Sequence, residues 1–412
     1  MPAHELDPQN VYDNFTLEEL KGAKNKEQLA ADERLKSVSA LFVNPKYMGQ
    51  EGELSGSGPY KLKEWVSGQS LILEKKENWW GDKLANQYPQ LKAYPKKLFF
   101  KIIPDVNAAI SLMKNGELDV IKSAPSATFV NLKEDDFIKE NYNFYSPSMF
   151  RHTFMPFNTT DTRLSDKNVR RAIAHVIDLD KIFENVYFGE KNPVASPIHP
   201  SKSEYHKGLS LIKYDITKAK ELLASAGWED TNNNGVLDKR IDGELKELNL
   251  KFTYLGGNSN AEGIADFFVE SAKSAGINIV KTPLSGRPLQ LGWKQKDFDI
   301  TVLGSSWYPL HKDLYQRWHS NGTHNYCGFG TTESDTLIEE IQSTVDEDKL
   351  RDLYKKIQEV IYEEQPVIFV NVGNERLIVN KKFGEITTTG ISPGFVINQF
   401  SNAGVPIKVS NN

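Results

Sequence analysis

Cysteine is nearly absent from this 412-residue sequence, which contains only Cys327. A single cysteine excludes an intrachain disulfide and any metal site that needs several thiolates. The neighbouring Tyr326 and Phe329 favour a small buried side chain over a reactive nucleophile. The sequence also has no apolar stretch close to the ~20 residues that span a bilayer, so it predicts no transmembrane helix.

Strong positive charge is missing too. The net charge is -5 and no long Lys/Arg run occurs, which argues against a nucleic-acid partner. The first ten residues, MPAHELDPQN, contain neither the basic region nor the apolar region of an export signal. The composition, 39% hydrophobic and 25% charged, is that of an ordinary globular protein, and the length suggests two or three domains.

Common catalytic motifs are absent as well. The sequence contains no G-x-S-x-G, H-E-x-x-H, G-x-x-x-x-G-K-[ST] or G-x-G-x-x-G. We therefore expect a binding protein that needs no cofactor. A hydrolase and a calcium-dependent adhesive module are the alternatives from other functional classes.

Hydrophobic periodicity predicts an α/β protein. Residues 56–81 read as a β-hairpin, followed by a strand over 98–103, a helix capped by Asp105 and a strand over 119–121. Further elements are predicted along the rest of the chain: helices beginning at Asp166 and Asp180, a helix over 217–226, a strand over 248–254, a helix over 261–275, a strand over 277–280, helices over 334–344 and 348–364, and a strand over 367–370.

An aromatic segment, residues 297–322, draws attention as a candidate site. A short apolar run over 300–303 predicts a buried strand, and Gly304 then begins a segment with two Trp, two Tyr and two His. Loops at the carboxyl ends of strands line the ligand crevices of α/β folds, so this cluster favours a binding site. The alternative is that the rings belong to the core, because large aromatic side chains are highly buried on average.

One loop matches part of a calcium-binding pattern. D-x-N-x-N-G-x-x-D places oxygens at Asp230, Asn232, Asn234 and Asp238. Position 12 of such a loop is Ile241, so the bidentate carboxylate is missing. An Asn/Gly hairpin turn explains the same residues, and we favour that interpretation.

Six runs, taken together, resemble the extracellular solute-binding proteins of family 5, which are oligopeptide-, dipeptide- and nickel-binding receptors of ABC importers. They occur in the family's order between about residues 56 and 370: Gly56-Ser-Gly-Pro-Tyr60, Asn78-Trp-Trp-Gly81, Ile103-Pro-Asp through Gly116-Glu-Leu-Asp119, Phe157-Asn158 with Val169-Arg-Arg-Ala-Ile173, Trp318-His-Ser320, and Glu364-Gln-Pro366. Pro2-Ala-His4 resembles a run from the middle of that family. The resemblance therefore implies that about the first third of a full member is absent.

The resemblance implies a periplasmic-binding-protein-like fold of type II, with two α/β lobes joined by a hinge and incomplete at the N-terminus. Residues 1–52 would be the tail of a missing domain and residues 53–149 lobe I. Residues 150–370 would be lobe III with a ligand-facing loop at 304–320, and residues 371–412 would return to lobe I.

The implied function is the receptor of an ABC importer, a monomer that captures a peptide or similar solute between its lobes and delivers it to a membrane permease. A receptor for nickel or a metal chelate is the alternative on the same fold. The implied location is the periplasm or the cell surface, with membrane contact only through the permease or a missing lipid anchor.

The resemblance also implies site residues. Alignment on the Trp318 run places Trp307 at the family's aromatic pocket position, and it places Leu310 where peptide-binding relatives have an Asp for the ligand's ammonium group. Free-amine peptides are then in doubt unless Asp313 takes that role. His311 would donate a hydrogen bond or bind a metal, with a structural role as the alternative.

Four more residues complete the predicted binding set. Tyr308 and Tyr326 would line the pocket. Arg151 and His152, at the crossing between lobes, would pair with a ligand carboxylate, Arg151 through its guanidinium group. A salt bridge at the hinge is the alternative role for Arg151.

Overall fold

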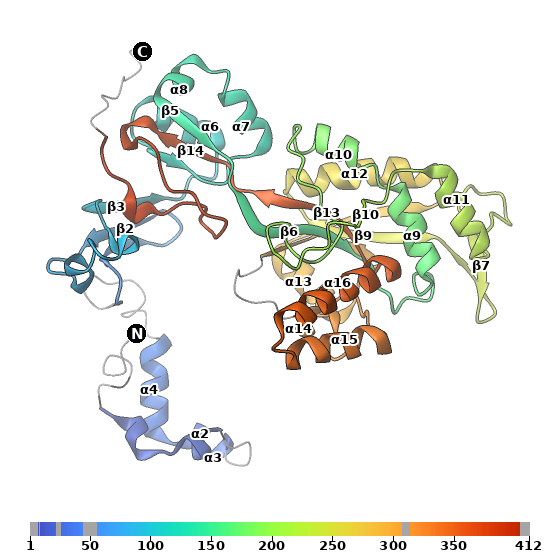
Figure 1. The fold of residues 1–412 in the computed structure, drawn as a ribbon, viewed down its shortest axis with the longest axis horizontal. Coiled ribbons are helices and arrows are strands. Elements are labelled where there is room, and N and C mark those ends of the chain that lie inside the picture. Colours follow the sequence, from blue (N-terminus) through green and yellow to red (C-terminus); the bar gives the residue numbers. More distant parts are fainter. Residues whose placement is uncertain (1–6, 8, 22–25, 44–55, 307–313, 404–412) are drawn as a thin grey trace.

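The computed structural model describes residues 7, 9–21, 26–43, 56–306 and 314–403. In this part of the chain, no helix has the length and apolar character required to cross a membrane. Two α/β lobes are joined by two long strands that cross between them (Figure 1).

Short helices precede the first lobe. They are η1 (Val11–Asn14), α2 (Leu17–Lys21), α3 (Lys26–Ala31) and α4 (Glu33–Val43). The sequence pattern had indicated little helix here. Their apolar positions are sparse, and Val11 and Val38 are the buried hydrophobic residues among the side chains described in this region.

The first lobe, at the upper left of Figure 1, contains two small sheets. One is antiparallel with the order β1-β2-β3, formed by β1 (Tyr60–Val66), β2 (Ser70–Lys75) and β3 (Lys97–Lys101). The other has the order β4-β14-β5, formed by β4 (Val120–Ile121), β14 (Leu377–Asn380) and β5 (Tyr142–Tyr145). The described part of the lobe also contains the α-helices α6 (Val106–Lys114), α7 (Ser126–Leu132) and α8 (Asp136–Asn141), and the short 3-10 helices η3 (Trp80–Lys83), η4 (Pro89–Leu91), η5 (Lys381–Phe383) and η6 (Ile397–Gln399).

The strands on either side of α6, β3 and β4, belong to different sheets. β3 pairs with β2, whereas β4 pairs with β14 from a distant part of the chain. Asp105 caps α6 as predicted, since its carboxylate accepts a hydrogen bond from the Ala108 amide at 2.7 Å. The core of this lobe surrounds Met113, Phe129 and Ile138.

The second lobe is built on a parallel sheet with the order β10-β9-β11, formed by β9 (Asn249–Leu255), β10 (Asn278–Leu284) and β11 (Ile300–Thr301). Leu250, Phe252 and Tyr254 of β9 are buried, as the apolar pattern predicted, and Thr253 is buried as well because β9 is the central strand. Its helices are α9 (Lys167–Val176), α10 (Leu179–Asn185), α11 (Ile216–Ser225), α12 (Ser259–Lys273), α13 (Gly286–Gln295), α14 (Tyr315–Trp318), α15 (Thr332–Ser343) and α16 (Glu347–Glu364). A hairpin of β7 (Asp238–Ile241) and β8 (Glu244–Glu247) projects from this lobe.

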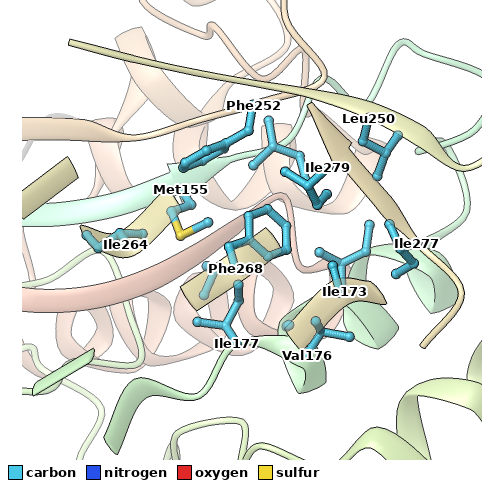
Figure 2. Close-up of a cluster of buried hydrophobic side chains, with 14 of the residues drawn as sticks. Met155, Ile173, Val176, Ile177, Leu250, Phe252, Ile264, Phe268, Ile277 and Ile279 are labelled. Atoms are coloured by element: carbon cyan, nitrogen blue, oxygen red, sulfur yellow. The ribbon is translucent and has the colours of Figure 1, made fainter. Parts of the chain in front are cut away.

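The main core of the second lobe lies between its parallel sheet and its helices. Phe268 of α12 contacts Phe252 of β9 edge to face, with 5.4 Å between ring centroids. Ile173 of α9 and Ile277, just before β10, are buried in the same cluster (Figure 2). Asp178 rather than Asp180 caps α10, because α9 ends directly before it and the Asp178 carboxylate accepts from the Lys181 amide.

The crossing sheet joins the lobes. Its order is β12-β6-β13, with β6 (Ser148–Pro156) between β12 (Leu303–Ser306) and β13 (Val367–Asn374), and both pairings are antiparallel. β13 continues four residues past the predicted strand, and the chain then enters the first lobe as β14. The predicted lobe boundaries near residues 150 and 370 fall within β6 and β13, the strands that cross between the lobes. The exact boundaries therefore stay a prediction.

Candidate functional site

A cavity of about 450 Å³ lies where the crossing strands meet the second lobe. Leu255 at the end of β9 and Val302 after β11 contribute to its wall, so the cavity opens at the carboxyl ends of parallel strands. Ser123, Glu375 and Arg376 add groups from the side of the first lobe. The cavity therefore has walls from both lobes, and its volume is typical of small-molecule sites.

Arg151 lines the cavity, and His152 does not. Successive side chains of a strand point to opposite faces, so Arg151 and Thr153 face the cavity, whereas His152 is 1% exposed beside His199 on the other face of β6. The structure thus separates two residues that the sequence analysis had grouped as one carboxylate-binding pair.

The surroundings of His152 are unfavourable for a charged imidazole. Burial lowers its pKa to about 3, and the nearby His199 and Arg317 add to the shift. Its ring centroid lies 5.8 Å from that of His199. A neutral buried histidine of this kind has a packing role in this conformation.

An ion pair between Glu190 and Arg376 forms part of the cavity wall. Arg376 Nη1 lies 3.0 Å from Glu190 Oε2, and the two side chains are 15% and 23% exposed. The second Glu190 oxygen accepts from the Ser146 hydroxyl at 2.8 Å, while Arg376 Nε donates to the Ala124 carbonyl at 2.7 Å. Glu190 follows α10 of the second lobe, so this network joins it to groups of the first lobe.

Among the described residues, Arg151 makes one hydrogen bond, to the backbone. Its Nη2 donates to the Asn374 carbonyl oxygen at 3.2 Å. Within the described residues it forms no ion pair, in contrast to Arg376. The predicted alternative of a hinge salt bridge for Arg151 is therefore not seen in the described part of the chain.

Carboxamide side chains form a large part of the polar lining. They come from the loop after α10, from α12 and the residue before it, from α13 and from β13: Asn192, Asn258, Asn260, Gln290, Asn371 and Asn374. The side-chain oxygens of Asn371 and Asn374 are buried and accept no hydrogen bond from the described residues. A buried acceptor without a donor is costly, so both oxygens need a donor.

Trp293 supplies an aromatic wall that the sequence reasoning missed. It lies near the end of α13 and its indole nitrogen donates to Thr301 Oγ1 at 3.1 Å. Its ring centroid lies 6.1 Å from that of the predicted Tyr326, which is not itself among the residues that line the cavity. The signal for Trp293 was weak, because a single Trp in an amphipathic helix reads equally well as core.

Four predicted ligand residues, Trp307, Tyr308, His311 and Asp313, lie outside the described residues. Of the described rings of the same segment, Trp318 and His319 are buried, and Tyr315 is half-buried against the core. Trp318 is buried against Phe329 and Phe369. His319 is buried and stacks on Tyr315 with centroids 4.1 Å apart. For these three rings, the core interpretation holds.

The Asp230–Asp238 loop uses its side-chain oxygens internally. Asp230 accepts from the amides of Asn234 and Gly235 at 3.0 and 2.9 Å, and Asp238 accepts from the Thr231 amide and hydroxyl. The side-chain amide groups of Asn232 and Asn234 donate to the Glu247 carboxylate. These contacts organise a turn that leads into the β7–β8 hairpin, as the favoured hairpin interpretation expects. They do not test the alternative, which is that the loop binds calcium.

Cys327 is buried beside Asn325, to whose side-chain oxygen its thiol donates at 3.3 Å. Burial raises the pKa of the thiol, so the reactive thiolate is disfavoured. This environment agrees with the predicted small apolar filler.

Comparison with known proteins connects this geometry to a family. The model for bacterial extracellular solute-binding proteins, family 5 Middle, matches residues 20–326. The oligopeptide-binding protein AppA of Bacillus subtilis is 29% identical over 330 residues, which are 78% of this chain and 57% of that protein. The nickel-binding protein NikA of Staphylococcus aureus is 24% identical, over 82% of this chain and 63% of its own length.

Solved structures agree with the fold. AppA of Bacillus subtilis in complex with a nonapeptide superposes with a TM-score of 0.72 at 25% identity, covering 92% of this chain and 71% of that one. NikA of Brucella suis in complex with Fe(III)-EDTA gives a TM-score of 0.72 at 20% identity, covering 84% and 68%. The predicted two-lobe α/β fold is confirmed, and this chain spans 57% of AppA and 63% of the staphylococcal NikA. The chain belongs to the bacterial extracellular solute-binding proteins of family 5.

Proposed function

We propose that this chain is the solute-binding receptor of an ABC importer, which captures a peptide or similar small solute between its lobes and delivers it to a membrane permease. The observation that carries this proposal is the 450 Å³ cavity at the crossing strands, with polar groups from both lobes. A solute that touches both walls favours the conformation in which the walls are close, because it gains contacts only there.

The lining suits a peptide better than a purely apolar solute. Carboxamide side chains offer both a donor and an acceptor, as peptide groups do. Arg151 offers a guanidinium group for a carboxylate, and Trp293 offers an apolar wall. The oligopeptide-binding name of AppA points the same way.

The arrangement favours binding over catalysis. Glu190 and Glu375, the acids among the described lining residues, each accept hydrogen bonds from neighbouring side chains, and the buried Cys327 thiol lies outside that lining. A receptor of this kind works outside the cytoplasmic membrane, in the periplasm or at the cell surface, as a monomer that meets its permease. A nickel or metal-chelate receptor is the second candidate, favoured by the similarity to NikA.

A fluorescence titration tests the proposal. Purified protein should show a saturable change in tryptophan emission with a random tripeptide pool and no hydrolysis of that pool by mass spectrometry. The nickel–histidine complex is the parallel ligand for the second candidate. Saturation by neither ligand would count against both receptor functions, and turnover of peptide would indicate an enzyme.

A variant locates the binding site. Trp293→Ala removes a wall of the cavity, and we expect affinity to fall about 2- to 10-fold, because an aromatic contact contributes about 0.5–1.5 kcal/mol. Trp65→Ala is the matched control, since Trp65 is 45% exposed on β1 of the first lobe. Equal affinity of Trp293→Ala and the unaltered protein would place the site elsewhere.

A further inference from the structure

The described part of the cavity lining carries two cations and two anions, which differ in how accessible they are: Arg151 is half-buried, Glu375 is 2% exposed, and Glu190 and Arg376 pair with each other. Arg376 is neutralised by Glu190 at 3.0 Å. Arg151 has only the Asn374 carbonyl oxygen at 3.2 Å and no ion-pair partner among the described residues. A partly buried cation without a counter-ion favours an anionic ligand group.

Among the described residues of the lining, neither carboxylate is readily reached by a ligand ammonium group. Both oxygens of Glu190 are occupied, one by Arg376 and the other by Ser146. Glu375 is 2% exposed and accepts from the Ser123 hydroxyl at 2.7 Å. Its side chain also packs closely against Gly394, where a Cβ atom would meet Glu375 Cγ at 2.9 Å. An ammonium group would have to share the Glu190 carboxylate with Arg376 and Ser146, or reach Glu375, which is almost fully buried.

The wall beside Arg151 also has acceptors that no described residue satisfies. The side-chain oxygens of Asn371 and Asn374 are buried and accept no hydrogen bond from the described part of the chain, and the carbonyl oxygen of Asn374 accepts from Arg151. Rotation of these side chains toward the cavity would present them to a ligand N–H. The last residue of a peptide carries both required groups, because its amide N–H lies next to its carboxylate.

We infer that this cavity recognises the carboxyl end of a peptide or an acylated amino acid, through Arg151 and the Asn371–Asn374 wall, and that it does not require a free amino end. This inference rests on the proposed receptor function. It goes further because it names the ligand class: carboxylate-terminated solutes, including those whose amino group is blocked.

Four tripeptide pools of identical random composition test the inference: free at both ends, N-acetylated, C-amidated, and blocked at both ends. Binding of each pool to the immobilised protein is quantified by mass spectrometry. We expect the free and N-acetylated pools to bind within about threefold of each other. Amidation should weaken binding about 10- to 100-fold, which is the range for losing a charged hydrogen bond.

Variants assign the effect to Arg151. In Arg151→Gln, the affinity ratio of free to amidated pools should fall to about one, whereas Arg151→Lys should keep part of the preference because it keeps the charge. Arg240→Gln is the matched control, since Arg240 is exposed on the β7–β8 hairpin and should keep the full ratio. The ratio is measured within each variant, so a general loss of stability does not mimic the result.

The outcomes separate this inference from the receptor function. Equal binding of amidated and free pools, or a tenfold loss on acetylation, overturns the inference and leaves peptide binding intact. An unchanged ratio in Arg151→Gln overturns the assignment to Arg151. Binding of no pool, together with saturation by the nickel–histidine complex, overturns the inference while the receptor function stands. Binding of neither overturns both.

Discussion

The Glu190–Arg376 ion pair offers a quantitative test of how the lobes are held together. The perturbation is a double-mutant cycle with Glu190→Gln, Arg376→Gln and the combination. Both side chains are less than a quarter exposed and the N–O distance is 3.0 Å, so the pair differs from exposed surface pairs that contribute about 0–1 kcal/mol.

The expected coupling follows from this geometry. Two unit charges 4 Å apart attract by about 4 kcal/mol at an effective dielectric constant of 20, before the desolvation of both groups is subtracted. Hydrogen bonds to charged groups contribute about 1.5–3 kcal/mol net. We therefore expect a coupling energy of about 1–2 kcal/mol between Glu190 and Arg376.

The cycle is needed because each single substitution does more than break the pair. Arg376→Gln also loses the hydrogen bond to the Ala124 carbonyl, and Glu190→Gln weakens the contact with the Ser146 hydroxyl. Only the coupling term isolates the ion pair, provided that the variants make no new contacts.

The measurement is urea unfolding of the four proteins at pH 7, followed by circular dichroism and by tryptophan fluorescence. Agreement of the two probes shows whether the lobes unfold together. A repeat in 1 M NaCl should reduce the coupling only partly, because partly buried pairs are screened less than exposed ones. A coupling energy below about 0.3 kcal/mol would refute the view that this contact fastens one lobe to the other.

Two further predictions concern the core and acid stability. Phe268→Ala should lower the free energy of unfolding by about 3–5 kcal/mol, because Phe268 is 1% exposed, whereas Phe99→Ala, at a position 55% exposed, should change it by less than about 1 kcal/mol. Burial lowers the folded-state pKa of His152 to about 3, so the unfolded state binds its proton first and stability is lost as pH falls below about 6.5. Between pH 7 and pH 5 this loss is up to about 2 kcal/mol.

Urea titrations at both pH values check these expectations. His152→Leu should remove most of the acid-dependent loss attributed to that residue, even if its stability at pH 7 differs. An equal loss in the variant and the unaltered protein would assign the pH dependence to other groups. For the core, similar effects of the two Phe substitutions would contradict the assigned burial.

The fold was largely readable from the sequence because local rules agreed along most of the chain. Asp105 and Asp166 were recognised as helix caps, and both accept the expected backbone hydrogen bond. The alternation in β9 gave its buried face. The pairing of β14 with β4 was not readable at the level of register, because residues distant in sequence meet there and a four-residue strand carries little pattern.

The candidate site was harder to predict for the same physical reason. Arg151 was found from its place at the crossing between lobes, but His152 was assigned to the same site, although neighbouring residues of a strand face opposite sides. Glu190, Trp293 and Arg376 reach the cavity from three distant segments. Each one alone reads as an ordinary helix or loop residue, and only the tertiary arrangement brings them together.

The position of β14 between β4 and β5 constrains how this protein is made. Residues 377–380 leave the ribosome more than 200 residues after β5, and until they do, β4 and β5 have no strand between them and present unpaired backbone groups. Translation can thus complete the parallel sheet of the second lobe well before the first lobe closes. A chain that ends before residue 377 would leave the edges of β4 and β5 without a hydrogen-bonding partner strand. Such a truncated product should aggregate rather than form a stable fragment.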